Sequence, residues 1–475
     1  MADHYAGRVM PAPNRFDPAS FGVFRVQGRT FDRDSGTVSL HYALDDRQAF
    51  VETITFETPF TAGPALDGPG LDRALLHLHI AAGTSYYKAA APLEVMVEED
   101  ALSSDEQEFH RHLYDDGLRE FAVTNGLPVP RPVRIRSDVE AGRWPRPAPV
   151  SRPGGLVVPI GGGKDSMVLI EAVKGLRPRL LAVNPHPLVV DLAGQTGLDL
   201  IVVRRRLDTR LADLNASGAL NGHVPITAIV SLIAVVGSFL YGYDTIAMAV
   251  ERSASEETVQ VDGVPVNHQY SKSLEFEFLL SGLVTTAIDP GVAYGSALRP
   301  YSELAIARTF ARLTGYHATF CSCNSAFRQS AAAGDRWCGH CPKCRFVGLM
   351  LAPFLSQGAL AAIIGRDLFA DPDQIDGFAD LMSDDDKPFE CVGERRESAA
   401  AMRMLSFRPE WQDSVVVATL GGRARALVDD EDVRALLTPS QMPGTDGTGS
   451  GATGTPGRLG PDVVAGVRRL MDEGA

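Results

Sequence analysis

The stretch Leu156–Gly175, LVVPIGGGKDSMVLIEAVKG, carries the strongest signal for the fold of this chain. An apolar run meets three consecutive glycines, and a segment with helical character follows. A strand that feeds a glycine-rich turn at a helix N-terminus lets the backbone approach a ligand closely, and it points free amides and the positive end of the helix dipole at that ligand. The stretch therefore predicts an anion site, and phosphate is the favoured ligand.

The spacing within the turn excludes two common phosphate-binding loops, since GxxxxGK[ST] and GxGxxG both fail here. What remains is GGGKDS, residues 161–166, which resembles the SGGxDS loop of the PP-loop ATP pyrophosphatases. Those enzymes cleave ATP between the α and β phosphates. The resemblance implies ATP as the bound nucleotide, although Gly161 replaces the loop serine and removes one hydroxyl donor. A glycine-rich turn without a ligand is the alternative.

The resemblance also implies roles within the turn. Lys164 is expected to meet phosphate charge, and Asp165 is expected to bind magnesium or to shape the loop. The expected nucleotide contacts are Gly161, Gly162, Gly163, Lys164, Asp165 and Ser166.

Beyond this turn, strand-like runs such as RLLAV, DLIVV and TIAMAV alternate with helical stretches. That alternation is typical of an α/β fold with a parallel sheet and helices on both faces. We expect a PP-loop catalytic domain over residues 156–437. A proline-rich linker is predicted at 144–155, because such sequences form stiff connectors.

The segments on either side of that domain have different patterns. Residues 1–143 begin with three alternating runs that favour antiparallel strands, and Ser103 and Glu106 have the spacing of a helix capping box. We expect a smaller α+β domain that contacts the substrate. Residues 438–475 are rich in Gly, Thr and Pro, so we expect a disordered tail with a short helix near its end.

Composition narrows the class of protein. The chain has 475 residues with 45% hydrophobic content, enough for a sizeable core, and its formal charge of −14 argues against nucleic-acid binding.

No secretory or lipidation signal is visible at the start, which favours the cytoplasm. The uncharged run Ile226–Tyr243 predicts a buried helix; a membrane span is the weaker alternative, because flanking Lys/Arg asymmetry is missing. Oligomeric state cannot be read from the sequence.

A cysteine cluster follows in residues 321–344. Cys338, Cys341 and Cys344 have CxxCxxC spacing, which lets thiolates converge on one tetrahedral ion. We predict structural zinc with a fourth ligand from Cys321 or Cys323, and we select Cys323. An iron–sulfur cluster and free thiols are the alternatives. The 7-cyano-7-deazaguanine synthases, a branch of the PP-loop superfamily, hold zinc on a similar knuckle beside the nucleotide, which implies a structural role near the active site.

Polar segments lie between and around these landmarks. Some follow predicted strands, and ligands in such folds bind beyond the carboxyl ends of the strands. A phosphate-bearing or carboxylate-bearing substrate suits these donors, whereas for Tyr86 a packed aromatic pair at a domain contact is the alternative. The predicted substrate contacts are Tyr86, Lys88, His223, Glu251, Ser253, Gln269, Tyr270 and Arg395.

Taken together, the GGGKDS loop, NGHVPITA, VNHQYSKSLEFE, WCGHCPKCRFVGLMLAPFL and CVGERRES are similar to the ATP-dependent UDP-N-acetylmuramoyl-L-alanyl-L-glutamate epimerases of bacterial peptidoglycan synthesis. The similarity extends from about Gly83 to Ser398. It implies inversion of the terminal L-glutamate of the UDP-muramoyl dipeptide to D-glutamate, with ATP and magnesium consumed to give AMP and pyrophosphate. The expected partners are that dipeptide and ATP.

The motif leaves the proton-transfer group open. His268, His223, Lys272 and Cys391 are candidates by chemistry alone, because each can exchange protons near neutral pH in a suitable environment. The expected catalytic set is Asp165, Lys164, His268, Lys272 and Cys391. Three other functions remain open: a synthase of the 7-cyano-7-deazaguanine kind, an epimerase of another peptide in secondary metabolism, and a nucleotide-binding regulator without turnover.

Overall fold

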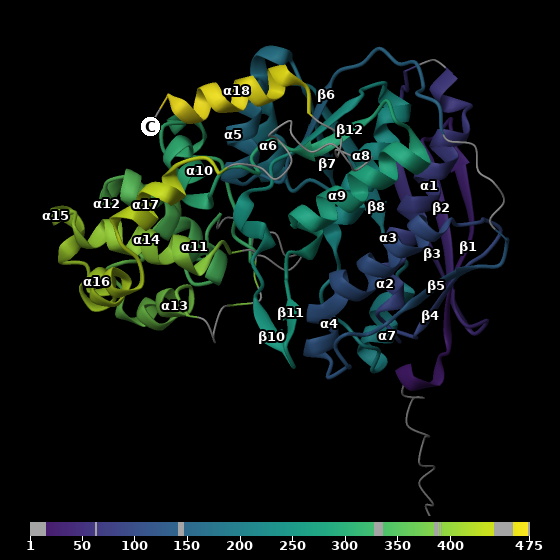
Figure 1. Ribbon diagram of the computed structural model, residues 1–475, viewed down its shortest axis with the longest axis horizontal. Coiled ribbons are helices and arrows are strands. Elements are labelled where there is room, and N and C mark those ends of the chain that lie inside the picture. The colour runs from purple at the N-terminus through teal and green to yellow at the C-terminus, as the bar shows by residue number, and fades with distance from the viewer. Residues whose placement is uncertain are drawn as a thin grey trace, which may run out of the picture.

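A computed structural model describes residues 16–61, 64–140, 147–326, 336–383, 388, 390, 392–440 and 459–473. Ten strands form one sheet in the order β12-β9-β6-β7-β8-β3-β2-β1-β4-β5, and β10 and β11 form a separate hairpin. The mixed α/β class predicted from the sequence is confirmed (Figure 1). The strands are β1 (Val23–Asp32), β2 (Thr37–Leu44), β3 (Gln48–Phe56), β4 (Glu94–Val97), β5 (Arg134–Ser137), β6 (Leu156–Pro159), β7 (Arg179–Val183), β8 (Leu200–Arg206), β9 (Thr245–Met248), β10 (Val259–Val261), β11 (Val264–Val266) and β12 (Ala293–Ser296).

Helices cover the sheet and continue beyond it into a helical C-terminal part, which lies to the left in Figure 1. The α-helices are α1 (Pro69–Ala82), α2 (Thr84–Tyr87), α3 (Ser104–Asp115), α4 (Arg119–Thr124), α5 (Lys164–Val173), α6 (Pro187–Thr196), α7 (Arg210–Ser217), α8 (Ile226–Tyr241), α9 (Leu274–Leu283), α10 (Glu303–Phe310), α11 (Pro342–Leu351), α12 (Gln357–Ile364), α13 (Ile375–Asp380), α14 (Arg395–Ser406), α15 (Pro409–Gln412), α16 (Val415–Leu427), α17 (Asp430–Leu437) and α18 (Pro461–Asp472).

The parallel half of the sheet places the glycine-rich turn at a switch in strand order. Strands β12, β9, β6, β7 and β8 run parallel to one another. The chain starts this half at β6, adds β7 and β8 on one side, and then adds β9 and β12 on the other. In doubly wound sheets, ligands bind outside the carboxyl ends of the strands at such a reversal. The turn at residues 161–163 follows β6 and therefore lies there.

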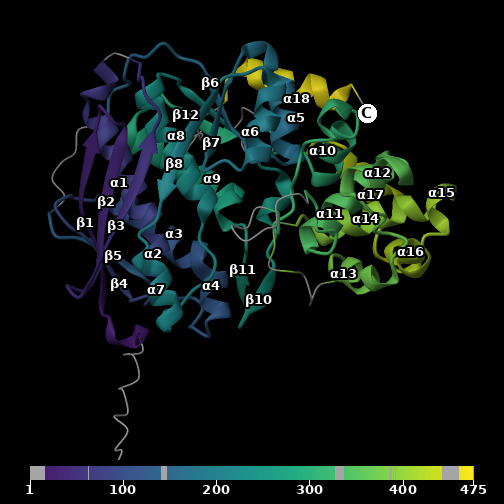
Figure 2. The ribbon, with the colours of Figure 1, turned by 180° about the vertical axis from the view of Figure 1, so that it is seen from behind.

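Alternation along the central strands separates two cores. On β6, Val157 belongs to the core that contains α1, α8 and α9, whereas Leu156 and Val158 belong to the core that contains α5, α6 and α10. Successive side chains of a strand point to opposite faces, so both faces of this half are covered by helices. Figures 1 and 2 show these two helical layers from opposite sides.

The antiparallel half joins the same sheet without a break. Strand β3 pairs antiparallel with β8, with Ile54 opposite Arg205, and β2 and β1 follow it. The three strands predicted near the N-terminus are thus confirmed, and the capping box of Ser103 and Glu106 begins α3 as expected. Strands from both sides of residues 144–155 share one sheet, while the division into domains at that linker stays a prediction.

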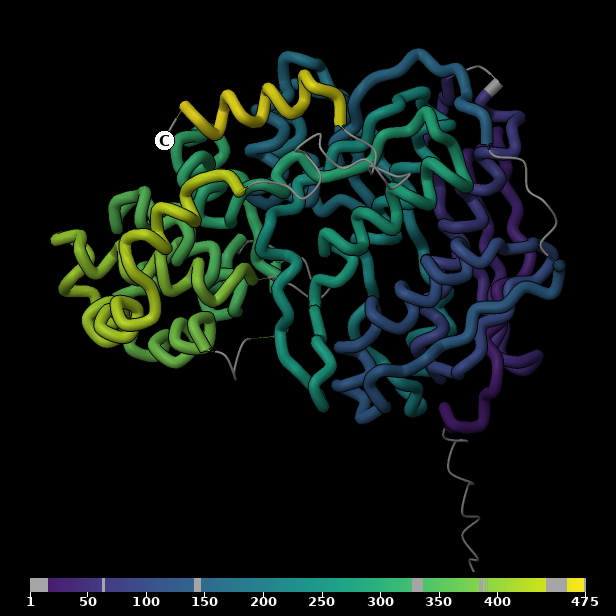
Figure 3. Tube along the Cα trace, viewed as in Figure 1, coloured from purple at the N-terminus to yellow at the C-terminus, as the bar shows by residue number. Residues whose placement is uncertain are grey.

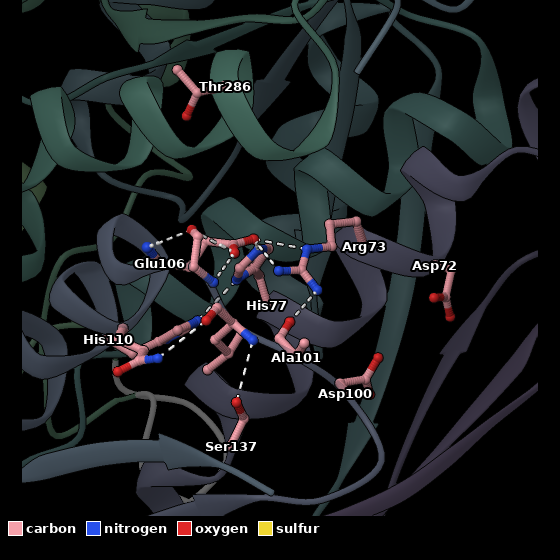
Figure 4. Close-up of polar contacts among 12 residues, drawn as sticks. Asp72, Arg73, His77, Asp100, Ala101, Glu106, His110, Ser137 and Thr286 are labelled. Carbon is pink, nitrogen blue, oxygen red and sulfur yellow. Dashed lines mark hydrogen bonds and ion pairs between the residues drawn. The ribbon is translucent and has the colours of Figure 1, made fainter. Parts of the chain in front are cut away.

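A buried polar network ties α1 to α3 (Figure 4). Arg73 Nε donates to Glu106 Oε1 at 2.7 Å, and His77 Nε2 lies 3.0 Å from the same oxygen. His77 Nδ1 in turn lies 2.9 Å from His110 Nε2. Burial alone would raise the pKa of Glu106, but the contacts from His77 and Arg73 lower it far below its usual range. The network therefore holds an ionised carboxylate inside the fold.

The long apolar run forms α8, which ends at Gly242 in the left-handed conformation, with φ +74°. It packs against α1 inside one of the two cores, as the sequence predicted for a buried helix. Within the described residues, no helix is long and apolar enough to cross a membrane.

The chain ends on a packed helix. α18 buries Val463, Val467 and Met471, and it contacts α5 and α10. A Cβ on Gly466 would lie 2.4 Å from the carbonyl oxygen of Ala172 on α5, so only glycine permits this approach. The short helix expected here is present. Of the tail expected to be disordered, residues 438–475, the part at 441–458 lies outside the described residues.

Candidate active site

The glycine-rich turn has the geometry of an open anion cradle. Gly162 has a φ of +88°, and Gly163 is the N-cap of α5 without a side-chain cap, so amides of the first helical turn are left for a ligand. A Cβ on Gly161 would meet nothing within 4 Å, whereas one on Gly163 would lie 2.9 Å from Ser322 Oγ. The position that lacks the loop serine therefore has room for a larger side chain.

Three carboxylates gather beside the turn. Oxygens of Asp165, Glu251 and Glu303 lie within 4.8 Å of one another. Glu251 follows β9 and Glu303 begins α10, so the ends of neighbouring parallel strands supply two of the three. Hard oxygen donors of this kind suit Mg²⁺. The arrangement fits the magnesium ion that the PP-loop resemblance implies.

Lys164 lies inside this group rather than on the surface. Its side chain is 1% exposed, and Nζ contacts the carboxylate of Glu303 and lies 2.5 Å from Asp165 Oδ1. Glu303 N in turn donates to Glu397 Oε1 at 2.8 Å. Burial, together with the nearby Glu394 carboxylate, raises the pKa of Glu397 well above its usual value. The ammonium is thus placed to balance carboxylate charge at the entrance to the turn.

The cysteine cluster has the shape of a four-thiolate metal site. The Sγ atoms of Cys323 and Cys341 are 4.0 Å apart, those of Cys338 and Cys344 are 3.7 Å apart, and those of Cys341 and Cys344 are 3.4 Å apart. A tetrahedron with Zn–S bonds of about 2.3 Å has edges of about 3.8 Å, so the four thiols fit zinc. Cys321 is directed elsewhere, because its Sγ donates to the carbonyl of Arg336 at 2.8 Å.

The cysteine segment also contacts the glycine turn. Cys321 N donates to the carbonyl of Gly162 at 3.1 Å, and Ser322 Oγ lies beside Gly163. The cysteine cluster and the glycine turn are therefore joined through residues 321–323.

A second polar cluster, the histidine cluster, is formed by Glu120, His223 and His268, which come from three separate segments of the sequence. His268 Nδ1 contacts Glu120 Oε2, and His223 Nδ1 lies 3.4 Å from the same oxygen. Lys88 Nζ donates to Asn221 Oδ1 at 2.7 Å and so anchors the loop before His223. Burial, and then the neighbouring His268, lowers the pKa of His223 to about 4. The structure therefore joins four residues that the sequence singled out separately, namely Lys88, His223, His268 and, through the pKa of His223, Lys272.

Glu120 is the member of this cluster that sequence reasoning missed. It lies on α4 and belongs to no motif, because a single glutamate on an amphipathic helix normally faces water. The β10–β11 hairpin lies between this helix and the C-terminal part (Figure 3). Arg119 donates to the carbonyl of Pro265 on the hairpin, and Arg395 donates to that of Thr258 from the other side.

The other predicted substrate contacts lie in different surroundings. Tyr86 is fully buried, stacks on Tyr42, and accepts a hydrogen bond from Asp208 N at 2.9 Å, which matches the packed-aromatic alternative. Ser253 and Tyr270 are buried, and their hydroxyls lack a hydrogen-bond partner among the described residues. Buried hydroxyls normally find partners, so these two are available to a ligand.

Three further predicted residues complete the set. Gln269 Nε2 donates to the carbonyl of Val392 at 3.2 Å, which connects the histidine segment to the start of α14. Arg395 lies 3.5 Å from Glu256 and is occupied largely by protein groups. Cys391 lies outside the described residues.

A cavity of about 1010 Å³ lies away from all these groups, between α1, α3 and α9. Its lining includes Asp72, Asp100, Asp105, Glu106 and Glu108, and it contains no residue of the glycine turn, the cysteine cluster or the histidine cluster. Carboxylates repel phosphate, so this cavity does not suit a nucleotide. Figure 4 shows the polar network that borders it.

Comparison with known families agrees with the resemblance seen in the motifs. The sequence model of the MurL N-terminal domain matches residues 15–297, and that of the MurL C-terminal domain matches residues 319–434. This chain belongs to the MurL family. The N-terminal match includes the glycine turn and the residues Lys88, His223, His268 and Lys272. The C-terminal match includes the four clustered cysteines.

Curated members of the MurL family are similar over most of their length. A protein of Salinispora tropica is 43% identical over 84% of this chain and 88% of its own length. Others, from a Micromonospora species and from Xanthomonas oryzae pv. oryzae, are 41% and 38% identical over 86% and 88% of this chain and 90% and 93% of their own lengths. Each is named UDP-N-acetyl-alpha-D-muramoyl-L-alanyl-L-glutamate epimerase. No solved structure matches the chain.

Proposed function

We propose that this MurL chain is an ATP-dependent epimerase that inverts the terminal L-glutamate of UDP-N-acetylmuramoyl-L-alanyl-L-glutamate. The names of its relatives support the epimerase activity and the substrate. The observation that carries the use of ATP is the glycine turn, which caps a helix at the strand-order switch of a parallel sheet. Adenylation of the glutamate α-carboxylate, with release of pyrophosphate, joins the two parts of the proposal.

The turn would hold the phosphates of ATP through backbone amides and the dipole of α5. Asp165, Glu251 and Glu303 would hold magnesium, which would supply charge neutralisation to the departing pyrophosphate. When ATP binds, its phosphate oxygens would compete with Glu303 for the ammonium of Lys164, and Lys164 would then also neutralise phosphate charge. The fold proposed for this half is the PP-loop domain.

Adenylation explains why an epimerase would consume ATP. A free α-carboxylate makes the adjacent C–H very weakly acidic, because loss of the proton would place a second negative charge beside the first. The acyl adenylate removes that charge and provides an electron sink. Each pKa unit gained in this way lowers the cost of deprotonation by about 1.4 kcal/mol.

We propose that the dipeptide, which accepts the adenylyl group, binds among the polar residues beyond β9 and around the hairpin. Ser253 and Tyr270 offer buried hydroxyls without partners among the described residues. Lys272 and His268 both lie close enough to His223 to affect its pKa. Gln269 and Arg395 connect this region to the C-terminal part. Such donors suit the carboxylates of a glutamyl peptide.

The cysteine cluster is proposed to hold a structural zinc ion through Cys323, Cys338, Cys341 and Cys344. The ion would fix the segment whose backbone bonds to Gly162. Its contribution would be to order the nucleotide turn rather than to take part in the reaction.

The test uses the full chain with ATP, magnesium and the UDP-muramoyl L-Ala-L-Glu dipeptide in deuterated water. We expect dipeptide-dependent release of pyrophosphate and deuterium at the glutamate α-carbon, with D-glutamate after hydrolysis. Pyrophosphate release that depends on a deazapurine acid, without exchange at the dipeptide, would support the synthase instead. ATP binding without pyrophosphate release for either acceptor would support a regulator.

A further inference from the structure

In the histidine cluster, the ring of His268 is oriented by a carboxylate. His268 Nδ1 contacts Glu120 Oε2, and both side chains are largely buried, at 14% and 12% exposed. A histidine whose Nδ1–H donates to a carboxylate carries the lone pair of its neutral ring on Nε2. The same pairing orients the base of many hydrolytic enzymes and stabilises the imidazolium that forms after proton transfer.

The backbone around His268 reinforces this orientation. Its backbone N–H donates to Thr258 Oγ1 at 3.2 Å, and Thr258 directly precedes β10. The next residue, Gln269, has its N–H on Asn267 Oδ1 at 2.7 Å. The backbone at His268 is therefore fixed by these two hydrogen bonds, and its ring contacts Glu120 of α4.

Charged and titratable groups among the described residues lie around the His268 ring. His223 lies with its ring centroid 4.8 Å from that of His268, and its lowered pKa keeps it neutral at pH 7. Lys272 and Lys88 are the cations close enough to act on His223. Glu120 is the carboxylate placed to stabilise a proton on His268.

We propose that Glu120 is a positioning residue that holds His268 so that its Nε2 takes the α-proton of the activated glutamate. This inference rests on the proposed function. The C–H electron pair moves into the carbonyl of the acyl adenylate, which becomes an enolate, and the proton stays on Nε2. A water molecule then protonates the opposite face of the enolate, which returns the electron pair to the carbon, and the proton on His268 neutralises the hydroxide left behind. A second water molecule hydrolyses the D-acyl adenylate to the free carboxylate and AMP.

A divalent metal is the competing use of the same atoms, because Glu120, His223 and His268 also have the spacing of a metal site. The geometry is against it. A metal would have to replace the His268–Glu120 contact. The base assignment keeps that contact.

The test separates the two half-reactions of the full-length protein. His268→Gln and Glu120→Gln are compared with the wild type and with Glu275→Gln, a control that removes a carboxylate 4.0 Å from another histidine, His112. Dipeptide-dependent exchange of labelled pyrophosphate into ATP reports adenylation. Deuterium entry at the glutamate α-carbon reports proton transfer.

We expect adenylation within about threefold of the wild type in all three variants. Deuterium entry should fall about 100-fold or more in His268→Gln, the range that removal of a general base produces. In Glu120→Gln it should fall about tenfold or more in kcat with KM for the dipeptide unchanged, and Glu120→Asp should recover part of the loss.

Several results would overturn the inference. Normal deuterium entry in His268→Gln would do so, as would a Glu120→Gln variant that behaves like Glu275→Gln. Loss of one bound divalent ion per chain in either variant would assign the cluster to a metal. Absence of pyrophosphate exchange in the wild type would instead contradict the proposed function itself. His268→Asn provides the same comparison if His268→Gln does not fold.

Discussion

Lys164 and Glu303 form an ion pair inside the protein, with side chains only 1% and 2% exposed. One residue begins the helix after the glycine turn, and the other begins α10, 139 positions later. The pair therefore connects the helix after the glycine turn to the helix that supplies a carboxylate to the proposed magnesium site. It also has consequences for stability, because an uncompensated charge in the interior is costly.

Lys164→Met should destabilise the fold by about 3–5 kcal/mol, since it leaves Glu303 buried without its cation. Urea unfolding at pH 7 measures this change. Lys174→Met is the matched control, because its ion pair with Glu171 has a lysine that is 40% exposed, and its loss should cost less than about 1 kcal/mol. Equal effects of the two substitutions would contradict the structural role of the buried pair.

Gly161→Ser should be tolerated and should lower KM for ATP several-fold, because the position is open and a hydroxyl adds a donor to charged phosphate. Gly163→Ala should raise KM for ATP, because its Cβ would press on Ser322 Oγ at 2.9 Å. Steady-state kinetics with varied ATP measure both. Gly175→Ala, whose Cβ would meet nothing within 4 Å, is the control and should leave KM unchanged. A Gly163→Ala enzyme with wild-type KM would show that this contact is unimportant.

Single Cys→Ser changes at Cys323, Cys338, Cys341 or Cys344 should lower zinc content and the melting temperature together. A structural zinc site contributes directly to folding free energy. Cys321→Ser should retain the zinc, because that thiol bonds to the carbonyl of Arg336 instead. Elemental analysis and thermal unfolding measure these outcomes. Zinc loss in Cys321→Ser with retention in Cys323→Ser would reverse the assignment.

Stability should decline as the pH falls from about 6.5 toward 4, because several buried histidines resist protonation. Burial lowers the pKa of His79 to about 3. Below pH 6.5 the unfolded chain binds a proton that the folded chain does not, so each such histidine costs up to about 1.4 kcal/mol per pH unit. Urea unfolding at pH 7, 6 and 5 should give a shallower decline for His79→Gln than for the wild type. Parallel declines would refute this origin.

Val467→Asp should destabilise the protein by several kcal/mol, because it places a charge where α18 packs on α5. Val464→Asp is the matched control, since Val464 is 44% exposed on the same helix and should change stability by less than about 0.5 kcal/mol. Urea unfolding measures both, and KM for ATP shows whether displacement of α18 reaches the turn. Equal stability of the two variants would mean that α18 does not support α5.

Much of the fold follows from local patterns. The strand, turn and helix of residues 156–173, the buried α8, the three strands β1–β3 and the cap of α3 all formed where the sequence predicted them. Each depends on short-range physics: apolar periodicity, glycine at a turn, a capping side chain. The short strands β4, β5 and β12 were missed, because charged or small residues interrupt them, whereas the equally short β6 and β9 lie in largely apolar runs.

The amino-acid sequence by itself determined the glycine turn, the cysteine spacing and the residue types for acid–base chemistry. Tertiary structure alone decided that β3 pairs with β8 in one sheet, that Lys164 meets Glu303, that Cys323 rather than Cys321 completes the cluster, and that Glu120 meets His268. These are contacts between distant segments, and they depend on how cores on the two faces of the sheet pack together. No local pattern records that packing.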